Sequence, residues 1–327
     1  MKNFTDHLKI QNFKSIKSVE LKDCRRINIF IGKPNVGKSN LLEAISLFSL
    51  PFLKYAKKKS LQQFIRVEND AELFFDGNVE RPIRIEYKGG SVSVTTDTKG
   101  LSIDIATEKG ITTLPFSDLT CKKNLATLEE NTPFRSYFFP TTFEKEKNSL
   151  SFLIPPAGTN LMSVVSQSNE MKKELTGIFA EYGLKYAFDA NSQEIKIIKE
   201  KKPGEIFLIP FHSIAETLQR MIFYKTAIES NQNAIITFEE PEAHSYPPYI
   251  LKITHSILES ENNQFFITTH SPYVINDFLE VDNNELAIYL VDFKQGETIV
   301  KRMSDRELQE AYEYGVDLFF NTETFWK

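Results

Sequence analysis

Residues 27–40 read INIFIGKPNVGKSN. In this stretch an apolar, isoleucine-rich run enters a loop of the form G-x-x-x-x-G-K-S, and the LLEAI that follows favours a helix. Strand, loop and helix in this order are the context in which glycines let backbone N–H groups close around a phosphate chain. In such a loop the lysine reaches the β- and γ-phosphates and the serine hydroxyl ligates Mg²⁺. The pattern therefore predicts a site for a nucleoside triphosphate and Mg²⁺, formed by Gly32, Asn35, Gly37, Lys38, Ser39 and Asn40.

The composition is that of an ordinary globular protein. The 327 residues are 41% hydrophobic and 25% charged, which is enough for one large domain or two interlocked ones. A net charge of −5 gives no overall basic field for nucleic acid, although two lysine clusters leave local nucleic-acid contacts open (Lys54, Lys57, Lys58, Lys59; Lys199, Lys201, Lys202). The two cysteines form no disulfide framework, and no apolar run is long enough for a membrane span. We expect a cytoplasmic protein without a membrane partner.

The hydrophobic pattern predicts an α/β fold with a split core. Strands are expected at residues 8–13, 19–21 and 27–31, a helix from Ser39 to about Phe48, and an antiparallel meander up to residue 105. Residues 106–150 give no clear pattern, whereas 160–182 favour a helix ending before Gly183, and 184–198 a hairpin. We therefore predict an N-terminal half with the meander (1–105), an inserted α+β subdomain (106–204) and a C-terminal half (205–327).

Two later strands are predicted to end in chemically useful groups. Residues 234–242, AIITFEEPE, form an apolar strand ending in carboxylates, and beside a phosphate loop Glu239 could ligate Mg²⁺ while Glu240 acts as general base. Residues 265–272, FFITTHSP, place His270 at the end of a second buried strand, where open α/β sheets bind ligands. A solvated acidic loop and a structural histidine are the alternatives.

The segment before the carboxylate strand allows two interpretations. Ser213 and Glu216 have the spacing of a capping box, which would explain both residues by helix formation alone. The same helix start would also present backbone N–H groups to an anion. The residues themselves do not separate these interpretations.

These motifs together resemble the ABC-type ATPase heads of the RecF, SMC and OLD branch, especially small AAA-family ATPases of bacterial phage-defence systems. The opening LKIQNFKSIK (8–17) is similar to that branch's first strand, and EEPEAH (239–244) to its carboxylate motif. The resemblance implies a P-loop NTPase fold and a dimer, or a higher oligomer, that sandwiches ATP between heads. It further implies that Ser213 acts on the ATP of a partner head, that His270 is a switch histidine, and that Lys14 and Ser15 lie near the nucleotide.

The chain departs from the branch at several positions. Ile214 and Ala215 stand where the signature has a glycine, and Ser245 and Tyr246 stand where leucine and histidine are common. A Mg²⁺-sensing glutamine has no clear counterpart among Gln62, Gln63 and Glu72. OLD proteins carry an acidic nuclease module, for which this sequence has no room after residue 321, so we expect a separate effector protein.

The sequence therefore favours an ATP-hydrolysing switch that controls a separate effector, such as a nuclease or toxin, in anti-phage defence. Two alternatives stay open: an ATP-gated scaffold with negligible hydrolysis, and a RecF-like DNA repair ATPase. A GTPase is disfavoured because no Asn-Lys-x-Asp segment is present. A transporter's nucleotide domain is disfavoured by the split core and long insertion.

Overall fold

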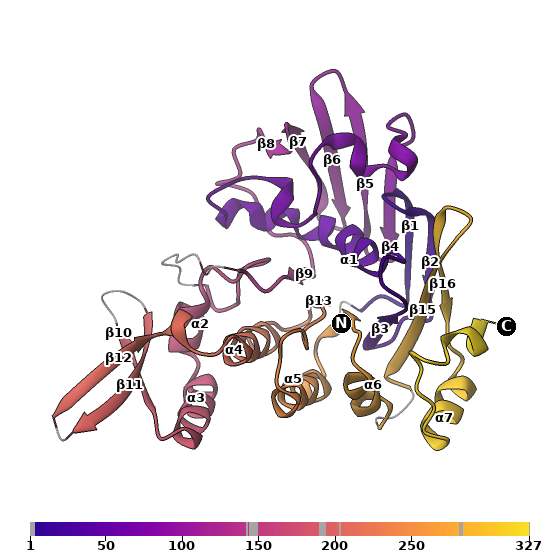
Figure 1. Ribbon diagram of the computed structural model, residues 1–327. Helices are drawn as coiled ribbons and strands as arrows, with labels where there is room; N and C mark the ends of the chain where they lie inside the picture. Colours follow the sequence, from indigo (N-terminus) through magenta and orange to yellow (C-terminus); the bar gives the residue numbers. More distant parts are fainter. Residues whose placement is uncertain are drawn as a thin grey trace. The chain divides into compact units, whose positions relative to one another are not determined.

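The computed structural model describes residues 4–141, 143, 150–189, 194–202, 204–280 and 284–326 (Figure 1). The chain forms two compact units. The first unit contains Met1–Tyr137, Asn233–Glu240 and Glu261–Lys327, and the second contains Phe138–Gln232 and Pro241–Ser260. The division into 1–105, 106–204 and 205–327 stays a prediction.

A six-stranded, mostly parallel sheet forms the core of the first unit. Its strand order is β16-β15-β3-β14-β13-β9, with the bounds β3 Ile27–Ile31, β9 Phe134–Tyr137, β13 Ile235–Glu239, β14 Gln264–Thr268, β15 Leu286–Lys294 and β16 Glu297–Arg302. Only β16 runs antiparallel to its neighbour. The central strands β3 and β14 are buried along their whole length, because a parallel sheet is covered on both faces, and this explains their continuous apolar runs.

Helices and short helical turns complete the first unit. The helix α1 packs against β9, β13 and β14. The bounds are α1 Lys38–Ser46, η1 Leu47–Tyr55, η2 Leu61–Gln63, η3 Asp70–Leu73, η4 Phe75–Gly77, α6 Pro272–Leu279, α7 Asp305–Glu313 and η6 Thr322–Trp326. The predicted helix up to about residue 48 therefore ends two residues earlier as an α-helix and continues as the 3₁₀ turns of η1.

A seven-stranded antiparallel sheet also belongs to the first unit. The order is β2-β1-β4-β5-β6-β7-β8, with the bounds β1 His7–Phe13, β2 Ile16–Lys22, β4 Ile83–Tyr87, β5 Gly90–Asp97, β6 Gly100–Thr107, β7 Gly110–Ser117 and β8 Thr120–Cys121. The predicted meander is therefore present. It also takes in β7 and β8, from the region that the sequence left unassigned.

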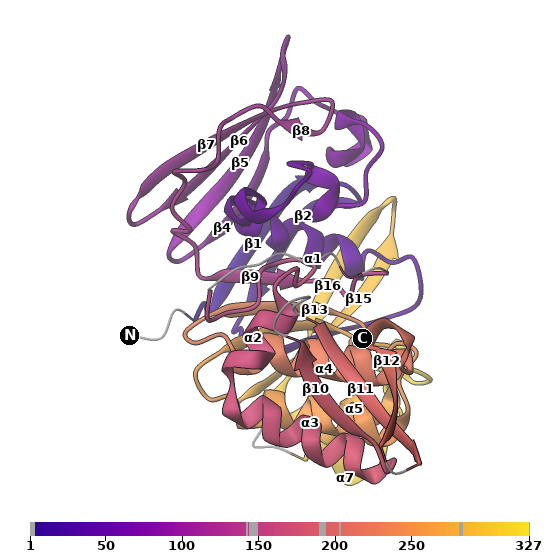
Figure 2. The same ribbon diagram turned by 90° about the vertical axis from the view of Figure 1, so that its left-hand side faces the viewer.

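The described residues of the second unit form the α-helices α2 to α5 and a three-stranded sheet of order β10-β11-β12. The bounds are α2 Leu161–Gln167, α3 Asn169–Glu181, β10 Lys185–Asp189, β11 Glu194–Lys202, β12 Glu205–Pro210, η5 Phe211–Ser213, α4 Glu216–Glu229 and α5 Pro247–Glu259. Within this unit α3 lies against β10 (Figure 2).

The single helix predicted over residues 160–182 is wrong. Ser168 has extended backbone angles, and its hydroxyl accepts a hydrogen bond from the Met171 amide, so it ends α2 and caps α3. The predicted end of the helix is confirmed, because Gly183 has a φ of 64° and its amide bonds back to Ala180. Among the described residues, no helix combines the length and the apolar composition that a bilayer crossing requires.

Candidate nucleotide-binding site

Three neighbouring parallel strands carry the candidate groups to one edge of the six-stranded sheet. The strand β3 leads into the glycine loop, β13 ends at Glu239, and β14 ends two residues before His270. Because β14 pairs in parallel with both β3 and β13, their carboxyl ends meet at the same edge.

The two glycines that define the loop are required by close packing. A Cβ atom at Gly32 would lie 2.2 Å from the Val291 carbonyl oxygen, and one at Gly37 would lie 2.1 Å from Thr298 Oγ1. Gly37 also has a φ of 99°, a conformation that side chains disfavour. The loop is therefore pressed onto β15 and β16, and its shape depends on both glycines.

The Lys38 ammonium is held inside the loop. Its Nζ donates hydrogen bonds of 2.8 Å to the carbonyl oxygens of Gly32 and Lys33. Lys38 is only 5% exposed, and this burial lowers its pKa to about 8, against an opposing effect of the Glu240 carboxylate. At neutral pH the group still carries its charge for the most part, so it can meet an anion that enters the loop.

Glu240 and His270 face each other, with 3.3 Å between Oε1 and Nε2. Burial lowers the pKa of His270, the Lys38 charge lowers it further, and Glu240 opposes both effects. The lowered pKa favours the neutral imidazole, which lies beside the Glu240 carboxylate. Glu240 has a φ of 41° and its amide donates to the Thr268 carbonyl oxygen at 3.0 Å, which fixes a backbone conformation of the kind that clusters at functional sites.

Glu239 takes part in a network of charges beneath the same edge. Arg66 donates from Nη2 to Glu239 at 2.6 Å and from Nε to Glu43 at 2.7 Å, and Lys14 donates to the other oxygen of Glu43. Burial alone would lower the pKa of Arg66, but the hydrogen bonds to Glu239 and Glu43 raise it. Glu43 is 2% exposed and joins two cations, and no sequence motif marks it for this role.

The residues present fit a magnesium ion. The Glu239 carboxylate already faces a cationic group, and Ser39 lies in the first turn of α1, directly after Lys38. Carboxylate and hydroxyl oxygens are the hard ligands that Mg²⁺ takes together with substrate phosphates. In the described part of the chain, no three His, Cys, Asp or Glu side chains gather as a metal cage.

A partly buried chain of side-chain hydrogen bonds under the loop was not predicted. Asn40 Nδ2 donates to Ser15 Oγ at 2.7 Å, Ser15 Oγ lies 2.7 Å from Thr298 Oγ1, and Thr298 Oγ1 donates to the Val36 carbonyl oxygen at 3.0 Å. The single hydroxyl hydrogen of Thr298 is donated to the Val36 carbonyl oxygen, so Ser15 must be the donor in the bond between Ser15 Oγ and Thr298 Oγ1. Ser15 therefore lies under the loop. No motif marks Thr298, which lies 283 residues from Ser15 in the sequence.

The predicted capping box at Ser213 is wrong. Ser213 ends the short turn η5, whereas α4 begins at Glu216 with Ala215 as its N-cap and no side-chain cap. The Ile214 carbonyl oxygen, between η5 and α4, accepts a hydrogen bond of 2.8 Å from Gln219 Nε2. Ser213 belongs to the second unit, and its action on a partner's nucleotide stays a prediction.

The first lysine cluster is partly engaged inside its own unit. Lys54 forms an ion pair with Glu130, and Lys59 Nζ donates to the Leu53 and Lys54 carbonyl oxygens at 2.8 and 2.7 Å. In the second cluster Lys201 lies over the Phe207 ring, 5.0 Å from its centroid. Lys54 and Lys59 therefore have structural roles.

Comparison with known proteins agrees with this geometry. The sequence model of a family described as AAA ATPase domain matches residues 5–205. The DNA replication and repair protein RecF of Lactobacillus acidophilus is 47% identical over 47 residues, which are 14% of this chain and 12% of RecF. The uncharacterized protein MJECL10 of Methanocaldococcus jannaschii is 27% identical over 142 residues, which are 43% of this chain and 54% of that protein. The matches thus span about half or less of these relatives.

A solved structure has the same fold. It is described as the SmcHead bound to the C-winged helix domain of ScpA, and it superposes with a TM-score of 0.51 at 15% identity, covering 94% of this chain and 99% of that chain. The chain therefore has the P-loop NTPase fold of an ABC-type ATPase head, with an antiparallel β subdomain and an α+β insertion. This confirms the fold that the sequence motifs predicted.

Proposed function

The chain belongs to the AAA ATPase domain family, and we propose that it is a switch that binds and hydrolyses ATP and thereby controls a separate effector protein. One observation carries the proposal: Glu240 and His270 lie 3.3 Å apart at the edge of the sheet where the glycine loop holds the buried Lys38 ammonium. From the sequence resemblance we further propose that the effector is a nuclease or toxin of bacterial anti-phage defence.

Each side chain has a chemical role in this proposal. Glu240 accepts the proton of the attacking water, and the neutral His270 beside it orients that water or the terminal phosphate by a hydrogen bond. Lys38 and the loop amides stabilise the charge that develops on the phosphate oxygens. Mg²⁺, held by Ser39 and Glu239, would supply further charge neutralisation when bound. Arg66 would then have to share or release Glu239.

The test replaces the proposed base. In Glu240→Gln we expect ATP turnover to fall roughly a hundredfold or more, because proton transfer is lost, while ATP affinity stays within about threefold. Steady-state phosphate release and equilibrium binding of a fluorescent ATP analogue measure the two quantities. The exposed Glu108→Gln, in a turn of the antiparallel sheet, is the matched control.

The outcomes separate the alternatives. Unchanged turnover in Glu240→Gln would remove Glu240 as the base. Tight ATP binding without turnover in the unaltered chain would instead favour the ATP-gated scaffold.

A second candidate function is a RecF-like DNA repair ATPase, favoured by the short match to RecF. It predicts DNA binding that weakens steeply with salt, because phosphate contacts release counterions. The structural roles of Lys54 and Lys59 count against the first lysine cluster as the contact surface. Binding of a duplex oligonucleotide, measured between low and physiological salt, tests this candidate.

A further inference from the structure

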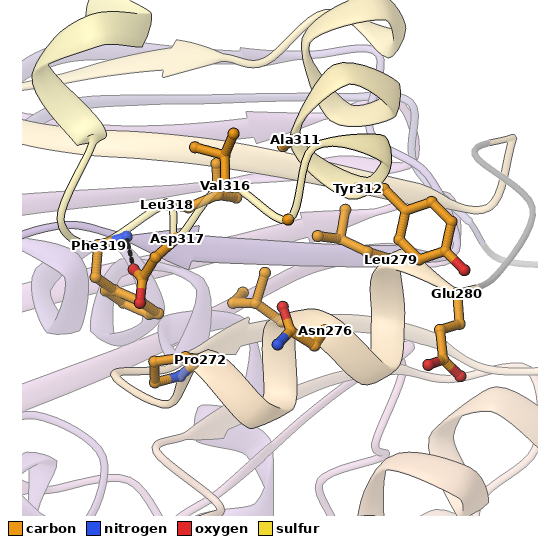
Figure 3. Close-up of a pocket in the computed structure, with 12 residues that line it drawn as sticks. Pro272, Asn276, Leu279, Glu280, Ala311, Tyr312, Val316, Asp317, Leu318 and Phe319 are labelled. Atoms are coloured by element: carbon orange, nitrogen blue, oxygen red, sulfur yellow. Dashed lines mark hydrogen bonds between the residues drawn. The ribbon is translucent and has the colours of Figure 1, made fainter.

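A pocket of about 400 Å³ lies between α6 and the end of α7, within the first unit (Figure 3). We call it the α6–α7 groove. The close-up shows α6 along one side and the segment that follows α7 along the other. Its apolar lining is contributed by both sides, through Ile275, Leu279, Ala311, Val316 and Leu318. The volume lies in the range of functional binding pockets, about 300–1,000 Å³.

The groove favours a positive charge. The first residue of α6, Pro272, lines one end of the groove, and the last turns of both α6 and α7 line it near Glu280 and Tyr312. Neither helix has a basic residue in its last turn, so the negative ends of two helix dipoles lie at this second end without a basic side chain of their own. Glu280 adds an exposed carboxylate to the lining, whereas Asp317 Oδ1 accepts hydrogen bonds from the amides of Phe319 and Phe320. No lysine, arginine or histidine is among the described residues that form the groove. Figure 3 shows Glu280 and Tyr312 at the same end of the groove, and the Tyr312 side chain is 54% exposed.

The two walls of the groove are connected along the chain to residues of the candidate nucleotide site. The helix α6 begins at Pro272, two residues after His270. The opposite wall, residues 315–319, continues to Glu323, whose carboxylate pairs with Lys33 of the glycine loop at 3.0 Å. A ligand in the groove would therefore touch the helix that begins two residues after His270 and the segment that precedes Glu323 in the chain.

We propose that the α6–α7 groove docks a segment of a partner protein that presents an arginine or lysine beside aliphatic side chains. The aliphatic groups would fill the floor around Ile275 and Leu279, and the cation would meet Glu280, the two helix ends and the exposed Tyr312 ring. That this partner is the effector rests on the proposed function. The docking itself requires no ATP hydrolysis.

The test selects partners by chemistry. Displayed random peptides are selected on the full chain, and those that also bind Asn276→Trp are removed. Asn276 is exposed and lines the groove, so tryptophan would fill it without replacing a buried side chain. We expect the retained peptides to carry lysine or arginine next to leucine, isoleucine, valine or methionine, and to lose at least tenfold in affinity in Glu280→Lys. Glu108→Lys, an equal charge change at an exposed turn outside the groove, should leave their affinity unchanged.

Several results would overturn the proposal. Retained peptides that are acidic, or that bind Glu280→Lys as well as the unaltered chain, would reject a cationic partner. The absence of any peptide that distinguishes Asn276→Trp would reject the groove as a docking site. A lower mass of Asn276→Trp in solution would show that a second copy of this chain occupies the groove. Since binding is measured without ATP, a chain that fails to hydrolyse ATP leaves this result intact.

Discussion

At the scale of single residues, the shape of the phosphate loop depends on a threonine that no motif identifies. Thr298 is 1% exposed, its backbone amide donates to the Ser15 carbonyl oxygen at 2.8 Å, and its hydroxyl donates to Val36. Asn40 donates to Ser15, Ser15 donates to Thr298, and Thr298 donates to the Val36 carbonyl oxygen, so each hydroxyl hydrogen is used once. The loop amides that would bind phosphate are thus held by a strand from the far end of the chain.

Thr298→Val should weaken nucleotide binding. The valine keeps the shape of threonine but leaves the Val36 carbonyl without its donor and the Ser15 hydroxyl without its acceptor, which costs about 1–3 kcal/mol in a buried site. We expect ATP affinity to fall about tenfold in equilibrium titration with a fluorescent analogue, if the loop bears most of this cost. Thr298→Ser keeps the hydroxyl and should bind nearly as well as the unaltered chain.

The control is Thr113→Val, because Thr113 is exposed and its hydroxyl bonds only to Asp104 in the antiparallel sheet. Equal affinity of Thr298→Val and Thr113→Val would show that the hydroxyl chain does not position the loop. A fall in melting temperature without a change in affinity would assign Thr298 to stability alone.

At the scale of elements, a buried thiol helps to hold β15 against the turn before β3. The Tyr289 hydroxyl donates to the Lys22 carbonyl oxygen at 2.8 Å and lies 3.3 Å from Cys24 Sγ. Burial raises the pKa of Cys24 to about 12 from its ordinary 9.0, against the opposing hydrogen bond with Tyr289. The folded state therefore favours the neutral thiol.

This predicts a slow reaction of Cys24 in the folded chain. In Cys121→Ser, which leaves one thiol, modification by a chromogenic disulfide at pH 9 should be roughly a hundredfold or more slower when folded than in denaturant, because the thiolate is the reactive form. The raised pKa of Cys24 also contributes to the free energy of unfolding. This contribution is fully present below pH 9 and is lost as the pH rises towards 12. Equal rates in the folded and unfolded states would contradict the burial of Cys24.

The strands around the site were predictable from the sequence because each is a buried, mainly apolar segment followed by a distinctive polar motif. The strands β3, β13 and β14 have mainly apolar sequences. The glycine loop with Lys38 follows β3, Glu240 follows β13 directly, and His270 lies two residues after β14. β9 escaped prediction because FRSY is short and mixed, and its partner β13 lies about a hundred residues away. The spacing at Ser213 suggested a capping box, but Ala215 caps α4 instead and Gln219 satisfies the neighbouring carbonyl. Spacing alone cannot show which residue the tertiary structure places at a cap.

At the scale of the whole molecule, the chain crosses between its two units directly after the proposed base. Glu240 is the last residue of a segment of the first unit, and Pro241 is the first residue of a segment of the second. The carboxylate motif at 239–244 is therefore shared between the units.

ATP-dependent association of two chains would bring Ser213 of one chain to the ATP of the other. If Ser213 meets the ATP of a partner head, the mass of Glu240→Gln in solution should double when ATP is added, because bound ATP persists without hydrolysis. The double variant Glu240→Gln, Ser213→Arg should stay monomeric, because the larger arginine side chain would fill the contact. Light scattering coupled to size-exclusion chromatography, with and without ATP, measures the mass. Ser151→Arg, an exposed serine of the same unit, is the matched control and should still associate. Association of the Ser213→Arg protein would place Ser213 outside the interface. A monomeric Glu240→Gln chain that binds ATP would reject the sandwich itself, because persistent ATP is the condition that should favour it most.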